Sequence, residues 1–137
     1  MAEAGYSGTP LPKKLGLKDG QAIAILNCPD GLVSLKTSAR FASCDDELSD
    51  QTDFDFVQIF SKSRDELENL LARARTAIKP GGMIWACWPK KASKVPTDIT
   101  EDTIRELAFP LDLVDVKVCA VDSVWSGLKL MIRKEKR

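Results

Sequence analysis

The sequence predicts an α/β fold of three layers, with a Rossmann-like, mostly parallel sheet that ends in an antiparallel hairpin. Three observations support this prediction. Short apolar runs typical of buried strands alternate with a segment of helical periodicity. Two long strand patterns close the chain with only a few residues between them. The length of 137 residues suits one domain better than two. We therefore expect residues 1–137 to form a single Rossmann-like domain covered on both faces of its sheet.

The first eight residues, "MAEAGYSG", predict an irregular N-terminal arm, which is followed by a short helix. Thr9 is a typical helix cap, Pro10 suits a first turn and Gly16 suits the stop. The apolar run "QAIAIL" then predicts a buried strand that ends in the turn "NCPDG", residues 27–31. Residues 32–42 fit either one strand or a short helix followed by a strand. The acidic segment "CDDELSDQTDFD" predicts a solvated loop or helix.

The middle of the chain carries a clear helix signal between two strands. "FDFVQIF" predicts the strand before it and "MIWACW" the strand after it. Ser63 and Glu66 form a capping-box pattern, and "KPGG" is expected to end the helix, with Gly81 at positive φ. The predicted apolar face consists of Leu67, Leu70, Leu71, Ala74 and Ile78.

The last third of the chain predicts a loop, a helix and a hairpin. Thr100 is expected to cap a helix through "EDTIREL". "LVDVKVCAV" and "SGLKLMIR" are then expected to pair as antiparallel strands. Asp115 and Lys117 are two residues apart, so they are expected to share one face of their strand. Trp125, near the hairpin bend, fits either an exposed contact residue or a side chain that folds back over the core.

Composition excludes several functional classes. The 20 basic and 20 acidic side chains cancel, which disfavours a protein that coats nucleic acid or an anionic membrane. The apolar runs are too short to cross a bilayer and the N-terminus lacks a signal pattern, so we expect a cytoplasmic protein. The chain has no His, which removes Ser-His-Asp and Cys-His catalysis. Its cysteines form no C-x-x-C pair, and we expect neither a metal site nor a catalytic residue.

Candidate ligand-binding residues follow from the rule that open parallel sheets bind ligands at the carboxyl ends of their strands. The rule selects residues 27–31, 60–62 and 88–91, which offer an amide, a thiol, a carboxylate, an indole and ammonium groups. An anion or a flat ring would find partners there. The candidates are Asn27, Cys28, Asp30, Gly31, Ser61, Trp88, Lys90 and Lys91.

The "WPKK" candidates and Cys28 each have an alternative structural interpretation. In "WPKK", Trp88 and Pro89 form an apolar wall, and the following lysines, with Lys94, could attract a phosphate or carboxylate. The alternative is a core tryptophan beside solvated lysines. Cys28 is a reactive thiol if an ammonium group lowers its pKa, and otherwise a small packed side chain.

Three pieces of the sequence resemble class I S-adenosylmethionine-dependent methyltransferases. "LGLKDGQAIAIL" is similar to their lead-in and first strand, and "FDFVQIF", the helix and "IKPGGMIW" to their fourth and fifth strands. The final hairpin is similar to their sixth and antiparallel seventh strands. This resemblance covers about two thirds of the chain. In addition, "GYSGTPLPKKLGLKDGQ" and "WPKKASKVPTDITEDTIREL", with the terminal hairpin, resemble domain of unknown function 3052, a family of small bacterial proteins.

The turn after the first strand departs from the methyltransferase pattern. Those enzymes carry an acidic residue and a G-x-G-type turn there, because only glycine lets the backbone approach the cofactor closely. Here Asn27, Cys28 and Pro29 occupy the turn, and Gly31 alone remains. Pro29 also offers no N–H group. We therefore expect the turn to be closed.

A second departure is the length of the following segment. Only 25 residues separate Asn27 from Asp53, where a full methyltransferase needs roughly 60 for two strands and three helices. The acidic ribose ligand of the family has no clear counterpart beyond Asp45 or Asp46. The scaffold is therefore expected to be a truncated one.

The sequence thus predicts a non-catalytic ligand- or partner-binding module on a degenerate methyltransferase scaffold. No cofactor is expected. The expected partner is a small anionic ligand or a protein, and the sequence is compatible with a homodimer. No contact with a membrane is expected. Two alternatives stay open. One is an S-adenosylmethionine-dependent methyltransferase with an atypical cofactor site. The other is a nucleic-acid accessory protein whose basic patch combines Lys90, Lys91 and Lys94 with the tail "RKEKR".

Overall fold

A six-stranded sheet in the order β2-β1-β3-β4-β6-β5 forms the centre of the computed structural model, which describes residues 9–48 and 53–137. Neighbouring strands run parallel except where β6 meets β4 and β5. The mostly parallel sheet and its antiparallel hairpin are therefore confirmed. The strands are β1 (Ala22–Leu26), β2 (Ser43–Asp45), β3 (Phe54–Phe60), β4 (Ile78–Pro89), β5 (Leu113–Ala120) and β6 (Trp125–Ile132).

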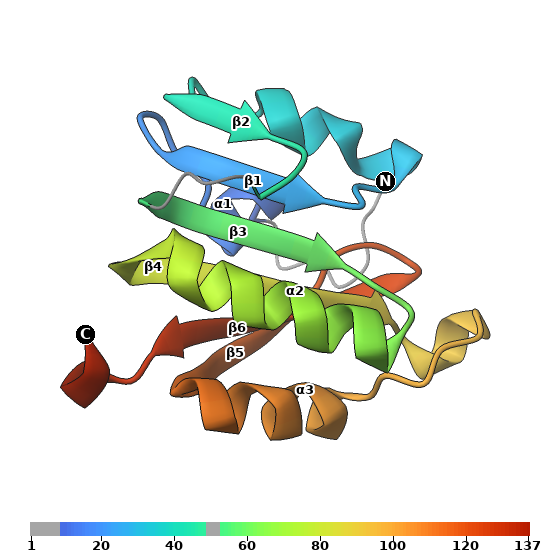
Figure 1. Ribbon diagram of the computed structural model, residues 1–137. Helices are drawn as coiled ribbons and strands as arrows, with labels where there is room; N and C mark the ends of the chain where they lie inside the picture. Colours follow the sequence, from blue (N-terminus) through green and yellow to red (C-terminus); the bar gives the residue numbers. More distant parts are fainter. Residues whose placement is uncertain (1–8, 49–52) are drawn as a thin grey trace.

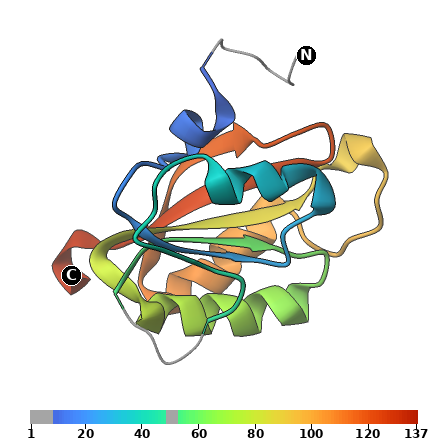
Figure 2. The same ribbon diagram turned by 90° about the horizontal axis from the view of Figure 1, so that it is seen from above.

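Helices lie on both faces of this sheet, as three layers require (Figures 1 and 2). Helices α2 (Arg64–Ala77) and α3 (Glu101–Ala108) bury Leu67, Leu71 and Ile104 against one face. Helix α1 (Leu11–Leu15) and the 3-10 helix η1 (Asp30–Thr37) cover part of the other face, around Trp85 and Phe56. Three further 3-10 turns are η2 (Lys91–Ser93), η3 (Phe109–Leu111) and η4 (Lys134–Lys136).

The order of strands reverses between β1 and β3. After β1 the chain passes to the sheet edge at β2 and then returns to the opposite side of β1 to form β3. The chain therefore leaves β1 toward one edge of the sheet and leaves β3 toward the other edge. Open α/β sheets bind ligands in the crevice between two such carboxyl ends.

The ends of the helices show which of the predicted capping residues occupy cap positions. The Ser63 side chain accepts a hydrogen bond from the Glu66 N–H (3.3 Å), and Thr100 forms a full capping box with Thr103. Gly16 ends α1 in the left-handed region at φ 90°, as predicted. The start of α1 was predicted one residue too early, because Pro10 rather than Thr9 holds the cap position. The predicted arm at residues 1–8 lies outside the described residues.

The expectation for Gly81 is wrong. Helix α2 ends at Ala77 and β4 begins at the next residue, so "KPGG" belongs to the strand. Among the described glycines only Gly16 and Gly20 have positive φ. A Cβ at Gly81 would meet nothing within 4 Å, whereas one at Gly82 would lie 2.9 Å from the Phe54 carbonyl oxygen. The close approach of β3 therefore constrains the second glycine of the pair.

Two other local predictions need correction. The acidic segment begins as a strand, since Cys44 and Asp45 belong to β2; its residues 49–52 lie outside the described part of the chain. In β5, a register shift places Asp115 opposite Leu130 and Lys117 opposite Lys129. These partners are consecutive, so Asp115 and Lys117 point to opposite faces. Of the two structures predicted for residues 32–42, the short helix followed by a strand is closer to the observed one, since η1 precedes a strand that starts at Ser43.

Candidate functional site

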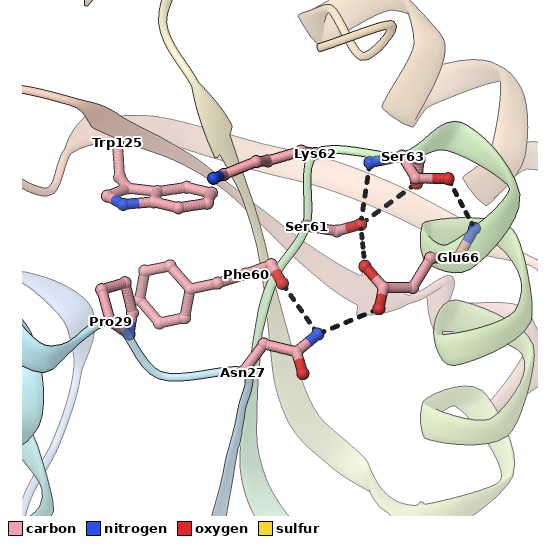
Figure 3. Close-up of a pocket in the computed structure, with 8 residues that line it drawn as sticks. All are labelled: Asn27, Pro29, Phe60, Ser61, Lys62, Ser63, Glu66 and Trp125. Atoms are coloured by element: carbon pink, nitrogen blue, oxygen red, sulfur yellow. Dashed lines mark hydrogen bonds between the residues drawn. The ribbon is translucent and has the colours of Figure 1, made fainter. Parts of the chain in front are cut away.

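A pocket of about 360 Å³ lies at the crevice between the carboxyl ends of β1 and β3 (Figure 3). We call it the switch-point pocket. Side chains from the ends of both strands meet there with the first turn of α2 and the start of β6. It is lined by Asn27, Pro29, Phe60, Ser61, Lys62, Ser63, Glu66 and Trp125.

One wall of the pocket is a hydrogen-bonded carboxylate. The buried Ser61 hydroxyl lies 2.6 Å from Glu66 Oε1, and Asn27 Nδ2 lies 3.4 Å from Glu66 Oε2 (Figure 3). The Ser63 N–H in turn donates to Ser61 Oγ (3.2 Å). The Glu66 side chain thus points toward Ser61 and Asn27. Of the capping box predicted for Ser63 and Glu66, the hydrogen bond from the Glu66 N–H to the Ser63 side chain forms, while the Glu66 carboxylate contacts these other residues. These contacts orient a carboxylate that is otherwise exposed to solvent.

The opposite wall is aromatic. Trp125 packs edge-on against Phe60, with ring centroids 5.1 Å apart and an interplanar angle of 87°. The backbone N–H of Trp125 donates to Asp122 Oδ1 (2.7 Å), which holds the start of β6 in place. Trp125 is only 8% exposed. Of the two predicted readings, the side chain that folds back over the core is the observed one.

Asn27 joins the ends of β1 and β3. Its backbone lies in the left-handed region at φ 58°, and its Nδ2 donates to the Phe60 carbonyl across 3.1 Å. Asparagine tolerates this backbone region better than most residues. Two residues after Asn27, Pro29 lines the pocket, and Asp30 then starts η1. The turn that a glycine-rich loop occupies in methyltransferases is therefore bridged by a side chain.

The other candidates from this turn lie outside the switch-point pocket. Asp30 and Gly31 are exposed at the start of η1. Cys28 packs against the apolar cluster beneath α1 and η1. Burial raises the pKa of the Cys28 thiol, and the nearby Lys36 offsets this only in part. A raised pKa is the opposite of what a reactive thiolate needs.

The "WPKK" segment belongs to a different pocket, of about 520 Å³, between the end of β4 and the start of α3. Trp88 and Lys91 line it together with Lys94. Lys90 lines neither pocket, and its backbone N–H donates to the Val124 carbonyl (2.7 Å). The structure therefore brings Asn27 and Ser61 together and keeps them apart from Trp88 and Lys91.

A third pocket, of about 350 Å³, adjoins the first on the side of β2. It shares Asn27 and Glu66 with the switch-point pocket, and Asp46 and Glu47 line its far side. Asp46 directly follows β2 and pairs with Lys36 (2.8 Å). The Asn27–Glu66 contact thus separates two neighbouring cavities.

The basic patch expected for nucleic-acid binding is not assembled. In the β4–β6 pairing, Pro89 lies opposite Trp125 and Met83 opposite Met131. Lys90 and the lysines after it therefore follow one end of the sheet, and the C-terminal tail follows the other (Figure 1).

Glu66 and Trp125 are the main site residues that the sequence-based choice missed. The Ser63-x-x-Glu66 pattern had a sufficient local explanation as a helix cap, and no local pattern joined Trp125 to Phe60.

Within residues 9–48 and 53–137, no group of three or more His, Cys, Asp or Glu side chains is placed to hold a metal ion. In the same ranges, no helix has the length and hydropathy needed to span a bilayer.

Solved structures of methyltransferases have this fold. A SAM dependent methyltransferase from Aquifex aeolicus is similar with a TM-score of 0.68 and 16% identity, over 88% of this chain and 86% of that one. A putative type 11 methyltransferase from Sulfolobus solfataricus gives 0.66 and 15%, over 90% of each chain. Magnesium protoporphyrin IX methyltransferase from Synechocystis PCC 6803, with bound SAH, gives 0.59 and 10%, over 83% and 74%. The chain therefore has a methyltransferase-like fold.

Sequence comparison adds no family to this finding. No family model matches the chain, and no curated protein matches it. The resemblance to domain of unknown function 3052 stays a prediction. The alignments with the Aquifex aeolicus and Sulfolobus solfataricus proteins cover nearly the same share of each chain, so the lengths of these two proteins are similar to that of this chain. Length alone therefore does not separate this chain from proteins described as methyltransferases.

Proposed function

We propose that this protein binds a flat heterocyclic molecule of nucleoside size in the switch-point pocket, and that it does not transfer a methyl group by itself. The observation that carries the proposal is the pairing of two walls across the pocket (Figure 3). Glu66, oriented by Ser61, forms the polar wall, and Trp125 on Phe60 forms the aromatic wall. A pocket with an apolar wall and few oriented polar groups is typical of small-molecule sites.

The charges of the pocket favour a ligand that donates hydrogen bonds. The Glu66 carboxylate is an acceptor: Ser61 donates to one of its oxygens and Asn27 Nδ2 lies 3.4 Å from the other, so two of about four acceptor positions have partners. Lys62 also lines the pocket, so the net charge of its two ionic side chains is near zero. A neutral ring with N–H or O–H groups therefore fits better than an anion. Stacking on Trp125 suits any flat ring, as the bases of nucleosides are.

The geometry of the turn after β1 supports ligand binding without methyl transfer. In methyltransferases, a glycine turn lets the backbone approach the cofactor. Here the side chain of Asn27 bridges to Phe60, and Pro29 has no N–H to offer. A nucleoside in the pocket would find its ring and donor contacts, but not the backbone cradle for the remainder of the cofactor.

A methyltransferase with an atypical cofactor site is the second candidate. Two observations favour it: structural neighbours are described as having bound SAM or SAH, and Asp46 lines a second cavity next to the switch-point pocket. A cofactor that spans both cavities would have to displace the contact between Asn27 and Glu66. This candidate thus requires that bridge to open.

Calorimetric titration with adenosine tests the proposed site. We expect saturable binding to the unaltered protein and about fivefold weaker binding to Glu66→Gln, because the variant loses a charged acceptor at a partly solvated position. Glu68→Gln is the matched control, since Glu68 lies on the exposed side of the same helix. Absence of adenosine binding, or equal weakening by both substitutions, would contradict the proposal.

A further inference from the structure

The pocket between β4 and α3 has the character of a second ligand site. None of its lining residues belongs to the switch-point pocket. Its inner surface is apolar and comes from the end of β4 and the loop that follows it. This surface consists of Trp88, Pro89, Val95, Pro96 and Ile99. Trp88, Pro89 and Ile99 are buried, so their side chains are fixed by the core on which they rest.

Positive charge lines the mouth of this pocket. Lys91 and Lys94 are exposed, and within the described residues neither ammonium group takes part in an ion pair. Glu101 lines the pocket as well, but its carboxylate contacts the Arg105 guanidinium. The two lysines therefore carry the uncompensated charge of the pocket.

Hydrogen bonds hold the backbone of the loop that carries both lysines. η2 closes on itself, with the Lys94 N–H donating to the Lys91 carbonyl (3.1 Å) and the Ser93 hydroxyl to the Lys90 carbonyl (2.7 Å). Lys94 lies in the left-handed region at φ 61°, which disfavours side chains with a Cβ. The Thr97 hydroxyl ties the far end of the loop to the Lys62 carbonyl (2.7 Å).

We infer that this pocket binds a small organic anion, with a flat apolar body against Trp88 and a carboxylate, sulfonate or phosphate at Lys91 and Lys94. The charge of the ligand separates it from the class proposed for the switch-point pocket, where Glu66 offsets the positive charge of Lys62. The inference does not depend on adenosine binding, because the two pockets share no residue.

A pair of fluorescent dyes tests this inference. Anilinonaphthalene sulfonate has an aromatic body and one anionic group, and phenylnaphthylamine has the same body without the charge. We expect the sulfonate to bind the unaltered protein with a blue-shifted emission, and to bind the double variant Lys91→Gln/Lys94→Gln at least about fivefold more weakly. Binding of phenylnaphthylamine should be the same in both proteins.

Lys62→Gln, which removes an ammonium group from the switch-point pocket, is the control. It should leave binding of the sulfonate unchanged, and thermal unfolding should show that all variants are folded. The inference is wrong if the double variant binds the sulfonate as well as the unaltered protein does. It is also wrong if Lys62→Gln weakens binding equally, or if the unaltered protein does not bind the dye.

Discussion

The side-chain amide of Asn27 donates to the carbonyl of Phe60 across 3.1 Å and so ties the end of β1 to the end of β3. The same amide reaches Glu66, which is held by the Ser61 hydroxyl. These contacts occupy the crevice in which a methyltransferase-like sheet would present an open turn. Asn27 and Glu66 line both the switch-point pocket and the neighbouring pocket on the side of β2, so their contact lies between the two cavities.

Substitution of Asn27 should destabilise the protein, and alanine should do so more than glycine. Both variants lose the hydrogen bond to Phe60, but alanine also has a Cβ that disfavours φ 58°. We expect a loss of about 1 kcal/mol for Asn27→Gly and about 2 kcal/mol for Asn27→Ala. Urea denaturation measures both. An alanine variant as stable as the glycine variant would show that the left-handed turn is not retained.

Gly82 and Gly81 should respond differently to alanine. A Cβ at Gly82 would lie 2.9 Å from the Phe54 carbonyl oxygen, whereas one at Gly81 would lie in open space. We expect Gly82→Ala to cost at least about 1 kcal/mol of unfolding free energy, and Gly81→Ala to stay within about 0.5 kcal/mol. The comparison needs only two thermal unfolding curves. Equal effects would contradict the close approach of β3 to the start of β4.

Asp55 should make the protein sensitive to acid. Burial acts to raise the pKa of its carboxyl group, but the Ala22 N–H (2.8 Å) and Lys79 (3.0 Å) outweigh burial and lower that pKa. A lowered carboxyl pKa stabilises the fold above the unfolded pKa, and this contribution is lost as the pH falls through the folded pKa.

Asp55→Asn should therefore be less stable than the unaltered protein at pH near 7. It should also lose less stability than the unaltered protein between about pH 4 and pH 2, because it has no such carboxylate to protonate. Unfolding midpoints across this range measure the difference. Parallel pH profiles for the two proteins would rule out a contribution from Asp55.

The cysteines should differ in reactivity toward a disulfide reagent. Cys87 is fully buried, and burial raises its pKa to about 12. Cys44 is exposed on β2. We expect Cys44 to react first and Cys87 to react only when the protein unfolds. Cys44→Ser should remove the fast phase of the reaction. A fast phase that persists in this variant and is lost in Cys28→Ser would restore Cys28 as a reactive thiol.

The strands and the fold class could be predicted because their signals are local. The apolar runs that become β1, β3 and β4 lie between turn residues, and Ser63 and Thr100 do cap the helices that follow them. These elements and the methyltransferase resemblance predicted a mostly parallel sheet with an antiparallel hairpin, which the observed sheet and the structural similarity confirm.

The remaining features depend on contacts between distant residues. The sequence does not distinguish Gly82 from Gly81, because the atoms that would meet a Cβ at Gly82 belong to Phe54 on β3 and to Ile78 and Lys79, whose positions depend on how the start of β4 folds. The capping pattern could not show that Glu66 turns toward Asn27, which is 39 residues away. Trp125 and Phe60 likewise meet only once β6 is placed in the sheet. The polar and aromatic walls of the pocket are therefore tertiary features.

The affinity ratio between S-adenosylhomocysteine and adenosine, measured by calorimetry on the same protein preparation, tests the central claim most directly. If the pocket accepts a nucleoside and the bridged turn offers nothing to the amino-acid part, the two dissociation constants should agree within about tenfold, a difference of about 1.4 kcal/mol. Binding of S-adenosylhomocysteine more than about a hundredfold tighter than adenosine would mean that the turn at Asn27 opens to hold the whole cofactor. That result would contradict the account and favour a methyltransferase.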